Sequence, residues 1–422
     1  MEVKPGYKQT EVGVIPEEWE VVTATDACEL VVDCKNRTPP VVPDSDFAVV
    51  RTPNVRNGQF VLDELRFTDE ESYRVWTSRA VPQLGDIMIT REAPLGEVCA
   101  VPPNRKVCLG QRMMLYRPSP DRTSSNFLLY SLMSEPVREN LFRKIGGSTV
   151  GHAKVDDIRF LQVPLPPLPE QRAIAEALSD VDGLLGGLDR LIAKKRDLKQ
   201  AAMQQLLTGQ TRLPGFHGDW EVKRLGDFGK CLRGVSYKGD SDLSTHDTPH
   251  TKRLLRSNNV QNAVVVTDEV QFVSGARVSA HQILQQDDIL ICMANGSKAL
   301  VGKAGIFMLS DGHEYTFGAF MGCFRTNATE SNPAFVFYLF LTARYRDYIN
   351  NLLAGSSINN LRPSSIESLE FSTPPHPEQT AIASVLSEMD GELAVLEQRR
   401  EKTRALKQAM MQELLTGRTR LV

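Results

Sequence analysis

Apolar residues recur at alternating spacings of four and three in two long segments, one near the middle of the chain and one at its end. They are Ile174, Leu178, Val181, Leu185 and Leu188 in the first segment, and Ile382, Leu386, Met389, Leu393 and Leu396 in the second. This spacing places them on one stripe of a helix, as in the seam of a coiled coil. Pro169 and Pro377 suit the first turn of such a helix, and Gly209 and Gly417 suit its C-terminal cap. The pattern predicts two helices of about 40 residues each.

The two helical segments are nearly copies of each other. Residues 164–213 align with residues 372–421 without a gap, and about 29 of 50 positions are identical. Both segments open with Pro-Glu-Gln and close with the sequence LLTG-x-TRL. Weaker similarity extends upstream, where VVRTPNVRNG (49–58) matches LLRSNNVQNA (254–263) and EEWEV (17–21) matches GDWEV (218–222). We interpret the chain as a tandem duplication of a variable globular part followed by a repeated helix.

Charge changes sign along each of these helices. The first carries Glu170, Glu176, Asp180 and Asp182 before Arg190, Lys194, Lys195, Arg196 and Lys199, and the second carries Glu388, Asp390 and Glu392 before Arg399, Arg400, Lys402, Arg404 and Lys407. Antiparallel pairing sets acid opposite base, so we predict an antiparallel coiled coil within the chain, with an approximate two-fold axis. The same gradient could instead only offset the dipole of each helix. A helix of this size is roughly 60 Å long and could serve as a spacer.

The globular segments read as mixed α and β structure. GDIMIT (85–90) and DDILIC (287–292) are typical of buried strands, whereas FLLYSLMSEPVRENLF (127–142) and FVFYLFLTARYRDYI (335–349) are typical of amphipathic helices. The predicted fold class is therefore mixed α/β (α+β), with two globular segments separated by the two helices. The predicted parts are an N-terminal segment that completes the circular repeat (1–18), a first globular segment (19–165), a first spacer helix (166–213), a second globular segment (214–373) and a second spacer helix (374–422).

Composition narrows the classes of function. The chain has 422 residues, of which 41% are hydrophobic and 24% charged, as in soluble globular proteins of two to four domains. No apolar run approaches the roughly 18 residues of a membrane helix and the start is polar, so we expect a cytoplasmic protein without a membrane partner. Seven cysteines without a C-x-x-C pair indicate reduced, mostly buried thiols. A net charge of −3 does not point to nucleic acid, but a local basic face can exist within an acidic total.

Polar loops are where the two globular segments differ most. They contain the residue types that read base edges, arginine for guanine and asparagine or glutamine for adenine. The candidates are Arg51, Asn54, Arg56, Asn57, Arg91 and Arg112 in the first segment, and Arg253, Arg256, Asn258, Asn259, Gln261, Asn262, Asn295 and Lys298 in the second. Ser148 and Ser356, in paired Gly-Ser segments, could offer backbone N–H groups to phosphate or could form plain turns. Each candidate taken singly could also be an ordinary turn or solvated surface residue.

Catalytic and metal-binding motifs are not recognised in the chain. The nearest approach to a P-loop, from Gly296 to Lys303, is one residue too long and is followed by Ala304 where a magnesium-binding hydroxyl belongs. His246 and His250 are separated by Pro249, which disfavours a helical metal pair. The sequence Asn-Pro-Ala-Phe (332–335) lacks the second proline of the adenine methyltransferase motif and is expected to start a helix. The chain is therefore predicted to be a binding protein without a catalytic residue or metal of its own.

The order of these parts resembles the specificity subunit of type I restriction-modification systems over the whole chain. The motifs that carry the resemblance are P-x-P-E-Q and LLTG-x-TRL in each helix, and YKQTEVGVIPEEWEV (7–21) near the start. It implies that the globular segments are target recognition domains, each binding one half of a split double-stranded DNA target. The helices would be conserved regions that set the gap between the halves and dock two methyltransferase subunits. In this sequence, those regions map to Pro169-Glu170-Gln171, Pro377-Glu378-Gln379 and the helices behind them.

The resemblance also implies a division of labour in the complex. The methyltransferase subunits would use S-adenosylmethionine to methylate adenine N6, and restriction subunits would cut DNA with ATP and magnesium, while this chain binds no cofactor. Because the loops of the two segments differ, we expect an asymmetric target. One alternative is a coiled-coil scaffold that binds proteins without DNA contact, which aromatic residues such as Tyr338 and Tyr345 permit. Another is a fused methyltransferase and specificity protein, against which the missing cofactor motifs and the short length count.

Overall fold

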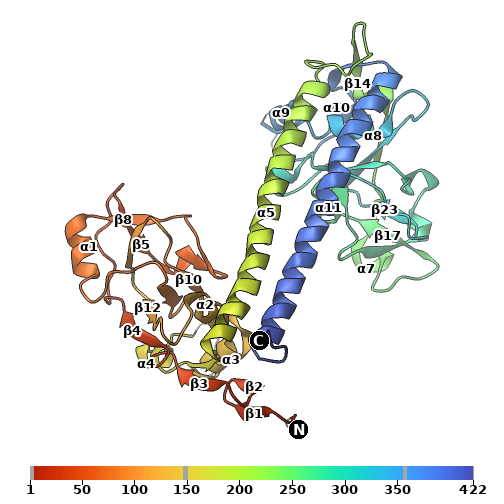
Figure 1. Ribbon diagram of the computed structural model, residues 1–422. Helices are drawn as coiled ribbons and strands as arrows, with labels where there is room; N and C mark the ends of the chain where they lie inside the picture. Colours follow the sequence, from red (N-terminus) through yellow and green to blue (C-terminus); the bar gives the residue numbers. More distant parts are fainter. Residues whose placement is uncertain (1–3, 146–150, 355–358, 422) are drawn as a thin grey trace. The chain divides into compact units, whose positions relative to one another are not determined.

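The computed structural model describes residues 4–145, 151–354 and 359–421 and divides the chain into two compact units. Unit 1 comprises Met1–Arg190 and Gln398–Val422, and unit 2 comprises Leu191–Glu397. The two long helices, α5 (Leu168–Leu206) and α11 (His376–Leu414), each contribute residues to both units (Figure 1). Each unit therefore combines one globular segment with part of both helices. The mixed α/β class predicted from the sequence is confirmed.

The sheets of unit 1 are small and mostly antiparallel. A four-stranded sheet has the order β10 (Val98–Ala100), β9 (Ile87–Thr90), β12 (Met113–Pro118), β4 (Cys28–Asp33). A three-stranded sheet has the order β11 (Lys106–Leu109), β5 (Phe47–Val50), β8 (Arg66–Thr68), with β11 parallel to β5. Three two-stranded pairs join β1 (Tyr7–Thr10) to β2 (Gly13–Pro16), β3 (Glu20–Thr23) to β13 (Gln162–Leu165), and β6 (Val55–Arg56) to β7 (Gln59–Phe60). All four residues of β9 are buried, which confirms the strand predicted in GDIMIT.

The helices of unit 1 pack on both of its larger sheets. They are α1 (Glu70–Trp76), α2 (Ser125–Met133), α3 (Glu135–Lys144) and α4 (Val155–Arg159), with a short 3-10 turn, η1 (Thr52–Asn54). Tyr73 of α1 packs against Phe47 of the three-stranded sheet. On the four-stranded sheet, Leu128 of α2 shares a core cluster with Ile87 of β9. The helical structure predicted over 127–142 is confirmed except at Ser134, where the chain breaks between α2 and α3. Ser134 is extended there, and Pro136, which lacks an N–H, lies in the first turn of α3.

The sheets of unit 2 are larger. A six-stranded sheet has the order β15 (Gly229–Arg233), β24 (Met321–Thr326), β21 (Ile289–Cys292), β22 (Ala304–Ile306), β19 (Val264–Val265), β18 (Val260–Gln261). A four-stranded sheet has the order β16 (Leu243–Ser244), β20 (Gln271–Ser274), β17 (Thr251–Leu255), β23 (Tyr315–Phe317), and β14 (Glu221–Arg224) pairs with β25 (Glu370–Thr373). The strand predicted in DDILIC is β21, and all four of its residues are buried.

The helices of unit 2 show the same break as those of unit 1. They are α6 (Leu225–Phe228), α7 (Gly239–Asp242), α8 (Pro333–Leu339), α9 (Ala343–Ala354) and α10 (Pro363–Glu367), with 3-10 turns η2 (Ser257–Asn259), η3 (Gly275–Arg277), η4 (Ala280–Gln282) and η5 (Lys298–Leu300). The helix predicted over 335–349 is two helices, because the Thr342 hydroxyl accepts the Tyr345 N–H and starts α9 anew. Asn332 caps α8 by accepting the Phe335 N–H at 3.0 Å, which confirms the prediction that this sequence begins a helix.

In each unit, α5 and α11 run in opposite directions and join acidic to basic positions. The pairs in unit 1 are Asp182 with Lys407 at 2.7 Å and Asp189 with Arg400 at 3.4 Å. The pairs in unit 2 are Glu392 with Lys195 at 2.6 Å, Asp390 with Lys199, and Glu397 with Arg196. The antiparallel pairing predicted from the charge gradient is confirmed, so the gradient does more than offset the helix dipoles. Gly209 and Gly417 follow the helix ends with φ of 71° and 69°, as expected of C-terminal caps.

All ten predicted seam residues are buried or half-buried in the folded chain. Ile174, Leu178, Leu188, Ile382, Leu386 and Leu393 are buried, and Val181, Leu185, Met389 and Leu396 are half-buried. The seam is not formed by the two helices alone. Ile174 shares a core cluster with Trp19 and Phe127 of the globular segment and with Leu414 of α11. The same stripe that pairs the helices therefore also binds the globular segment to them.

Candidate nucleic-acid interface

The opening motif of each long helix bonds to the closing motif of the other. In unit 1, the Glu170 carboxylate is 1% exposed and accepts Nη2–H of Arg420 at 2.7 Å and the indole N–H of Trp19 at 3.0 Å. In unit 2, Glu378 is 0% exposed and accepts Nε–H and Nη2–H of Arg212 at 2.5 and 2.7 Å. The hydrogen bonds to Glu170 raise the pKa of the Arg420 guanidinium. The P-x-P-E-Q and TRL motifs recur together because each is the binding partner of the other.

The glutamine of each opening motif holds the neighbouring globular segment. Gln171 accepts the backbone N–H of Ser124 at 2.8 Å, and Gln379 accepts that of Asn332 at 3.1 Å. Ser124 and Asn332 are the N-cap residues of α2 and α8. The Glu and Gln side chains are thus buried inside the chain. The family resemblance implied that these motifs dock methyltransferase subunits. The Glu and Gln side chains cannot make that contact directly, because they are buried.

A tyrosine on each globular segment makes the same contact with the paired helices. The Tyr130 hydroxyl donates to Asp182 and the Tyr338 hydroxyl donates to Asp390, both at 2.8 Å. Each carboxylate also pairs with a lysine, Lys407 in unit 1 and Lys199 in unit 2. The lysine ammonium lies 5.3 and 5.4 Å, respectively, from the centroid of the tyrosine ring. Burial, together with the bond to Asp182, raises the pKa of Tyr130. The loops of each globular segment are therefore carried on a domain that is firmly fixed to its helices.

Two of the predicted base-reading asparagines are internal braces of their loops. Asn54 and Asn259 are both 0% exposed. The Asn54 amide donates to the carbonyls of Val61 and Asp63 at 3.1 and 3.0 Å and accepts the Arg51 N–H at 3.1 Å. Asn259 makes the same three bonds, to Val266 and Asp268 at 3.1 and 2.7 Å and from Arg256 at 2.9 Å. The prediction that these two residues contact DNA is wrong, because their hydrogen-bonding groups are already used.

Arg51 and Arg256 belong to the same two braces. Nη2 of Arg51 donates to the carbonyl of Glu64 at 2.7 Å, and Nη2 of Arg256 donates to that of Glu269 at 3.4 Å. Nε of each arginine is buried without a hydrogen-bond partner among the described residues. Burial also lowers the pKa of Arg51. Each guanidinium therefore braces its loop through one backbone carbonyl, and a base-reading role for these two half-buried arginines stays a prediction.

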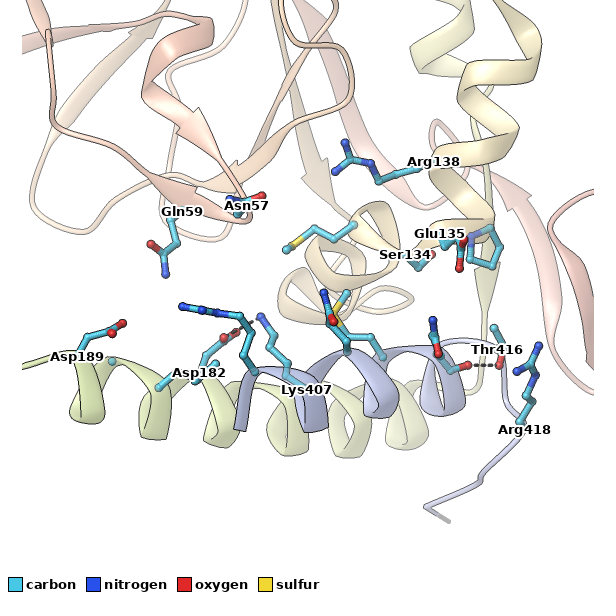
Figure 2. A pocket seen from close by; sticks show the side chains of 18 residues that line it. Asn57, Gln59, Ser134, Glu135, Arg138, Asp182, Asp189, Lys407, Thr416 and Arg418 are labelled. Carbon is cyan, nitrogen blue, oxygen red and sulfur yellow. Dashed lines mark hydrogen bonds and ion pairs between the residues drawn. The ribbon is translucent and has the colours of Figure 1, made fainter. Parts of the chain in front are cut away.

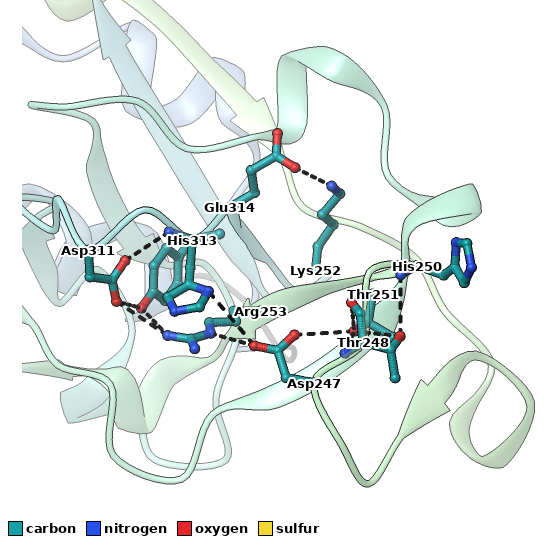
Figure 3. Close-up of polar contacts among 10 residues, drawn as sticks. Asp247, Thr248, His250, Thr251, Lys252, Arg253, Asp311, His313 and Glu314 are labelled. Atoms are coloured by element: carbon teal, nitrogen blue, oxygen red, sulfur yellow. Dashed lines mark hydrogen bonds and ion pairs between the residues drawn. The ribbon is translucent and has the colours of Figure 1, made fainter.

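Arg253 is held by an ionic network instead of facing a ligand (Figure 3). Its Nε donates to Asp247 at 3.0 Å, and its Nη1 donates to Tyr315 at 2.9 Å and to Asp311 at 3.2 Å. The hydrogen bond from Tyr315 lowers the pKa of Asp311 and keeps it charged beside the arginine. The guanidinium of Arg253 is thus neutralised within the chain, and its predicted contact with bases stays a prediction. The nearby His246 and His250 are exposed, and the parts of the chain that the structure describes contain no cluster of three potential metal ligands.

Arg91 and Arg112 are joined by a backbone hydrogen bond but differ in side-chain exposure. The N–H of Arg91 donates to the carbonyl of Arg112 at 2.8 Å. Arg91 is only 9% exposed and its Nη1 lies 3.5 Å from the carbonyl of Ala153, so its predicted role in reading bases is contradicted. Arg112 is exposed and forms an ion pair with Glu92, which also contacts His152 at 2.9 Å. The predicted contact of Arg112 with DNA stays a prediction.

The other candidates lie on or near the surface of the two loops. Arg56 and Asn57 are exposed in unit 1, as are Asn258, Gln261, Asn262 and Lys298 in unit 2, and Asn295 is half-buried. Asn295 lies 3.4 Å from the hydroxyl of Ser257, so the loops that carry Asn258 and Lys298 meet in unit 2. Ser148 and Ser356 lie outside the described residues. These exposed residues, and not the braces beneath them, form the candidate interface.

A polar cavity of about 890 Å³ adjoins the loop of unit 1 (Figure 2). Asn57 and Gln59 lie on one side of it, opposite Asp182, Asp189 and Lys407 of the paired helices. Its other charged or basic lining residues are Glu135, Arg138, Arg404 and Arg418. Sequence reasoning missed Arg138 of α3 and Arg418 after α11 as candidates, whereas the basic half of the second helix had signalled Arg404 and Lys407. The cavity brings loop amides and helix cations together in one concave surface.

A second basic surface, also missed from the sequence, surrounds Trp76. The ammonium of Lys35 and the guanidinium of Arg37 lie 5.7 and 5.3 Å from the centroid of its ring. The indole N–H donates to the carbonyl of Arg37 at 3.0 Å. The run Lys35-Asn36-Arg37 was the available signal, since cations interleaved with an aromatic ring suit contacts with a phosphate backbone.

The cysteines are free and mostly buried, as predicted. All seven cysteines are free, and six of them are buried. Burial raises the pKa of the Cys99, Cys108 and Cys231 thiols to about 12.

Over residues 4–145, 151–354 and 359–421, no helix has both the length and the apolar character needed to cross a bilayer.

Comparison with known proteins agrees with the architecture. The family model described as type I restriction modification DNA specificity domain matches residues 16–192 and again residues 217–404. The chain is 31% identical to the StySPI specificity subunit of a type I restriction enzyme from Salmonella potsdam, over 88% of this chain and 81% of that protein. It is 23% identical to the MjaVIII specificity subunit from Methanocaldococcus jannaschii, over 96% and 94% of the two chains.

A solved structure supports the fold. The crystal structure of the type I restriction-modification system S subunit from M. genitalium matches with a TM-score of 0.59 at 15% identity, covering 98% of both chains. The resemblance inferred from the repeated motifs is confirmed by the family model, which covers both copies of the duplication. The chain belongs to the family of type I restriction modification DNA specificity domains, and it is a DNA-recognition subunit of a type I restriction-modification system.

Proposed function

We propose that this chain directs a type I complex to a split, asymmetric target in double-stranded DNA. Each globular segment acts as a target recognition domain and binds one half of the target. The observation that carries this proposal is the pair of loops braced by Asn54 and Asn259. Their internal hydrogen bonds are the same, whereas their exposed residues differ. A common framework with different exposed donors is what two related readers of different sequences require.

The long helices supply the distance between the two halves of the target. Each has 39 residues and so extends about 58 Å at 1.5 Å per residue. Buried Glu–Arg pairs at their ends and acid–base pairs along them support a fixed helix register. A fixed register means that helix length sets the gap. The exposed faces of the same helices are where we place the docking of two methyltransferase subunits.

The chain serves the complex as a non-catalytic subunit. The methyltransferase subunits would bind S-adenosylmethionine and methylate adenine N6 after the base is flipped out of the stack. Restriction subunits would supply cleavage with ATP and magnesium. This chain contributes the positioning of the DNA, and phosphate contacts by the partner subunits would complement its net charge of −3. A protein-binding scaffold without DNA contact is not favoured, because the matched family is a DNA specificity domain.

Domain exchange tests the proposal. Residues 20–163 would be replaced by the corresponding segment of another family member, and the complex formed with its methyltransferase subunits would be used to map methylated sites. We expect one half of the target to change while the other half and the gap stay the same. A matched exchange of residues 214–373 should change only the other half. Changes in both halves, or in neither, would contradict the assignment of one half to each segment.

A further inference from the structure

The two globular segments carry the same β-hairpin on the same framework. In unit 1 it is β6–β7 with the turn Asn57-Gly58, and in unit 2 it is β18–β19 with the turn Asn262-Ala263. The turn residues all have positive φ, 51° and 80° in the first hairpin and 48° and 66° in the second. Two such residues define the type I′ turn that joins strands most tightly. Both hairpin tips therefore have one well-defined backbone shape.

The framework beneath each hairpin is closed and leaves little freedom. The brace asparagine bonds the two strands of backbone that enter and leave the hairpin, and the valine that follows it, Val55 or Val260, is 0% exposed. In unit 1, the Asn57 N–H also donates to Glu97 at 2.7 Å, and Glu97 binds Arg138 at 3.1 Å. A side chain at the tip is thus carried on a rigid base, which is what selective recognition needs.

Exposed positions of the hairpin differ on this shared framework, and the polar one just before the turn differs in the bases it suits. The residue before the turn is Arg56 in the first hairpin and Gln261 in the second, and both are exposed. Arg56 makes no side-chain hydrogen bond or ion pair to the described residues, so its guanidinium fork is available. Gln261 donates one amide N–H to the carbonyl of Asn258 at 3.0 Å, which orients the amide and leaves its second N–H and its oxygen available.

These two sets of groups match different bases. An arginine fork donates to O6 and N7 of guanine, whereas a glutamine amide donates to N7 and accepts from N6 of adenine. The first hairpin also borders the cavity of unit 1, which is lined by Asn57 at its tip and by Gln59, the strand partner of Arg56 (Figure 2).

We propose that Arg56 and Gln261 are equivalent specificity-determining residues. Arg56 reads a guanine in the half-site bound by the first globular segment, and Gln261 reads an adenine in the half-site bound by the second. This inference rests on the proposed function, because it assigns the discriminating contact within each half. Asn54, Asn259, Arg51 and Arg256 act only by holding the hairpin that presents these residues.

Two reciprocal substitutions test the inference in the assembled complex. Wild-type chain, Arg56→Gln and Gln261→Arg would each be co-expressed with the cognate methyltransferase subunit, and N6-methyladenine would be mapped across the host genome. Arg56→Gln should lower the preference for guanine over other bases at one position of the first half by about 5- to 150-fold and leave the second half unchanged. Gln261→Arg should lower the preference for adenine at one position of the second half and leave the first half unchanged. Arg105→Gln, at an exposed turn of the first segment, is the charge-matched control and should change neither half.

The outcomes separate this inference from the proposed function. If the wild-type complex gives no split motif, the proposed function fails. If wild type gives a split motif and Arg56→Gln leaves base preference unchanged, the inference is wrong while the function stands. An equal loss of methylation at all sites, without a change in preference, also overturns it, because that is the behaviour of a phosphate contact. Both side chains are exposed, so the variants should fold, and equal melting temperatures would verify it.

Discussion

Replacing Arg420 with methionine should destabilise unit 1 far more than a change at an exposed arginine. Glu170 is 1% exposed and depends on Arg420 and Trp19 for its hydrogen bonds. Removing one partner of a buried ion pair costs about 3–5 kcal/mol, because the remaining charge is left uncompensated. The Arg420 side chain is 28% exposed, so water can partly replace it. We therefore expect Arg420→Met to cost about 2–4 kcal/mol of unfolding free energy.

The matched control is Arg418→Met, two residues earlier in the same tail. The Arg418 side chain is 65% exposed and lies 3.9 Å from Glu413, so its loss should stay within about 0.5 kcal/mol. Adding Glu170→Gln to Arg420→Met removes the buried charge and should recover part of the loss, since the two effects are coupled. Urea unfolding of the full chain would be followed by tryptophan fluorescence, to which Trp19 contributes from beside the pair, and by circular dichroism. Equal stability of Arg420→Met and Arg418→Met would refute the claim that this contact fastens the helix end.

Four further outcomes follow from the same contacts. Ala263→Gly should raise the melting temperature, because Ala263 has a φ of 66° and relieving this strain should contribute roughly 1 kcal/mol. Gly58→Ala should lower it, because Gly58 has a φ of 80° and its new Cβ would also require the Met133 side chain to move. Asn54→Ala should cost about 2–3 kcal/mol in urea unfolding and weaken methylation through the first half-site, because the Val61 and Asp63 carbonyls lose their donor; equal stability would contradict its role as a brace. Iodoacetamide at pH 8 should label Cys99, Cys108 and Cys231 slowly in the folded chain and fully in denaturant. Burial raises their pKa to about 12, so the reactive thiolate is scarce at pH 8. Fast labelling of these three cysteines in the native chain would argue against their burial. One heptad inserted at matching positions of α5 and α11 should lengthen the gap of the methylated motif without altering either half, and an unchanged gap would argue against the helices as the spacer.

Much of the fold was readable from the sequence because its signals are local or repeated. The seam residues and the charge gradient gave the two long antiparallel helices, and the buried strands β9 and β21 followed from short apolar runs. Helical structure predicted over 127–142 and 335–349 is present, but the break within each stretch was not predicted, because apolar content outweighed the local break signals. Pro136 was such a signal in the first, and Thr342 caps a new helix in the second.

The candidate interface was less predictable, since burial depends on residues distant in the chain. Asn54 and Asn259 have the residue type that reads adenine, and only the folded loop shows that their amides are consumed by backbone carbonyls. Arg253 likewise has its charge neutralised by Asp311, 58 residues further along. Arg420 donates to Glu170 across 250 residues, and the repetition of both motifs showed that they recur but not that they bind each other.

The most direct test of the account is to co-express the wild-type chain with its cognate methyltransferase subunit in a host that lacks adenine methylation, and to map N6-methyladenine across the genome. The account predicts one asymmetric motif made of two different half-sites separated by a gap of constant length. Methylation at a continuous or symmetric motif, or no new methylation from a stably assembled complex, would contradict it.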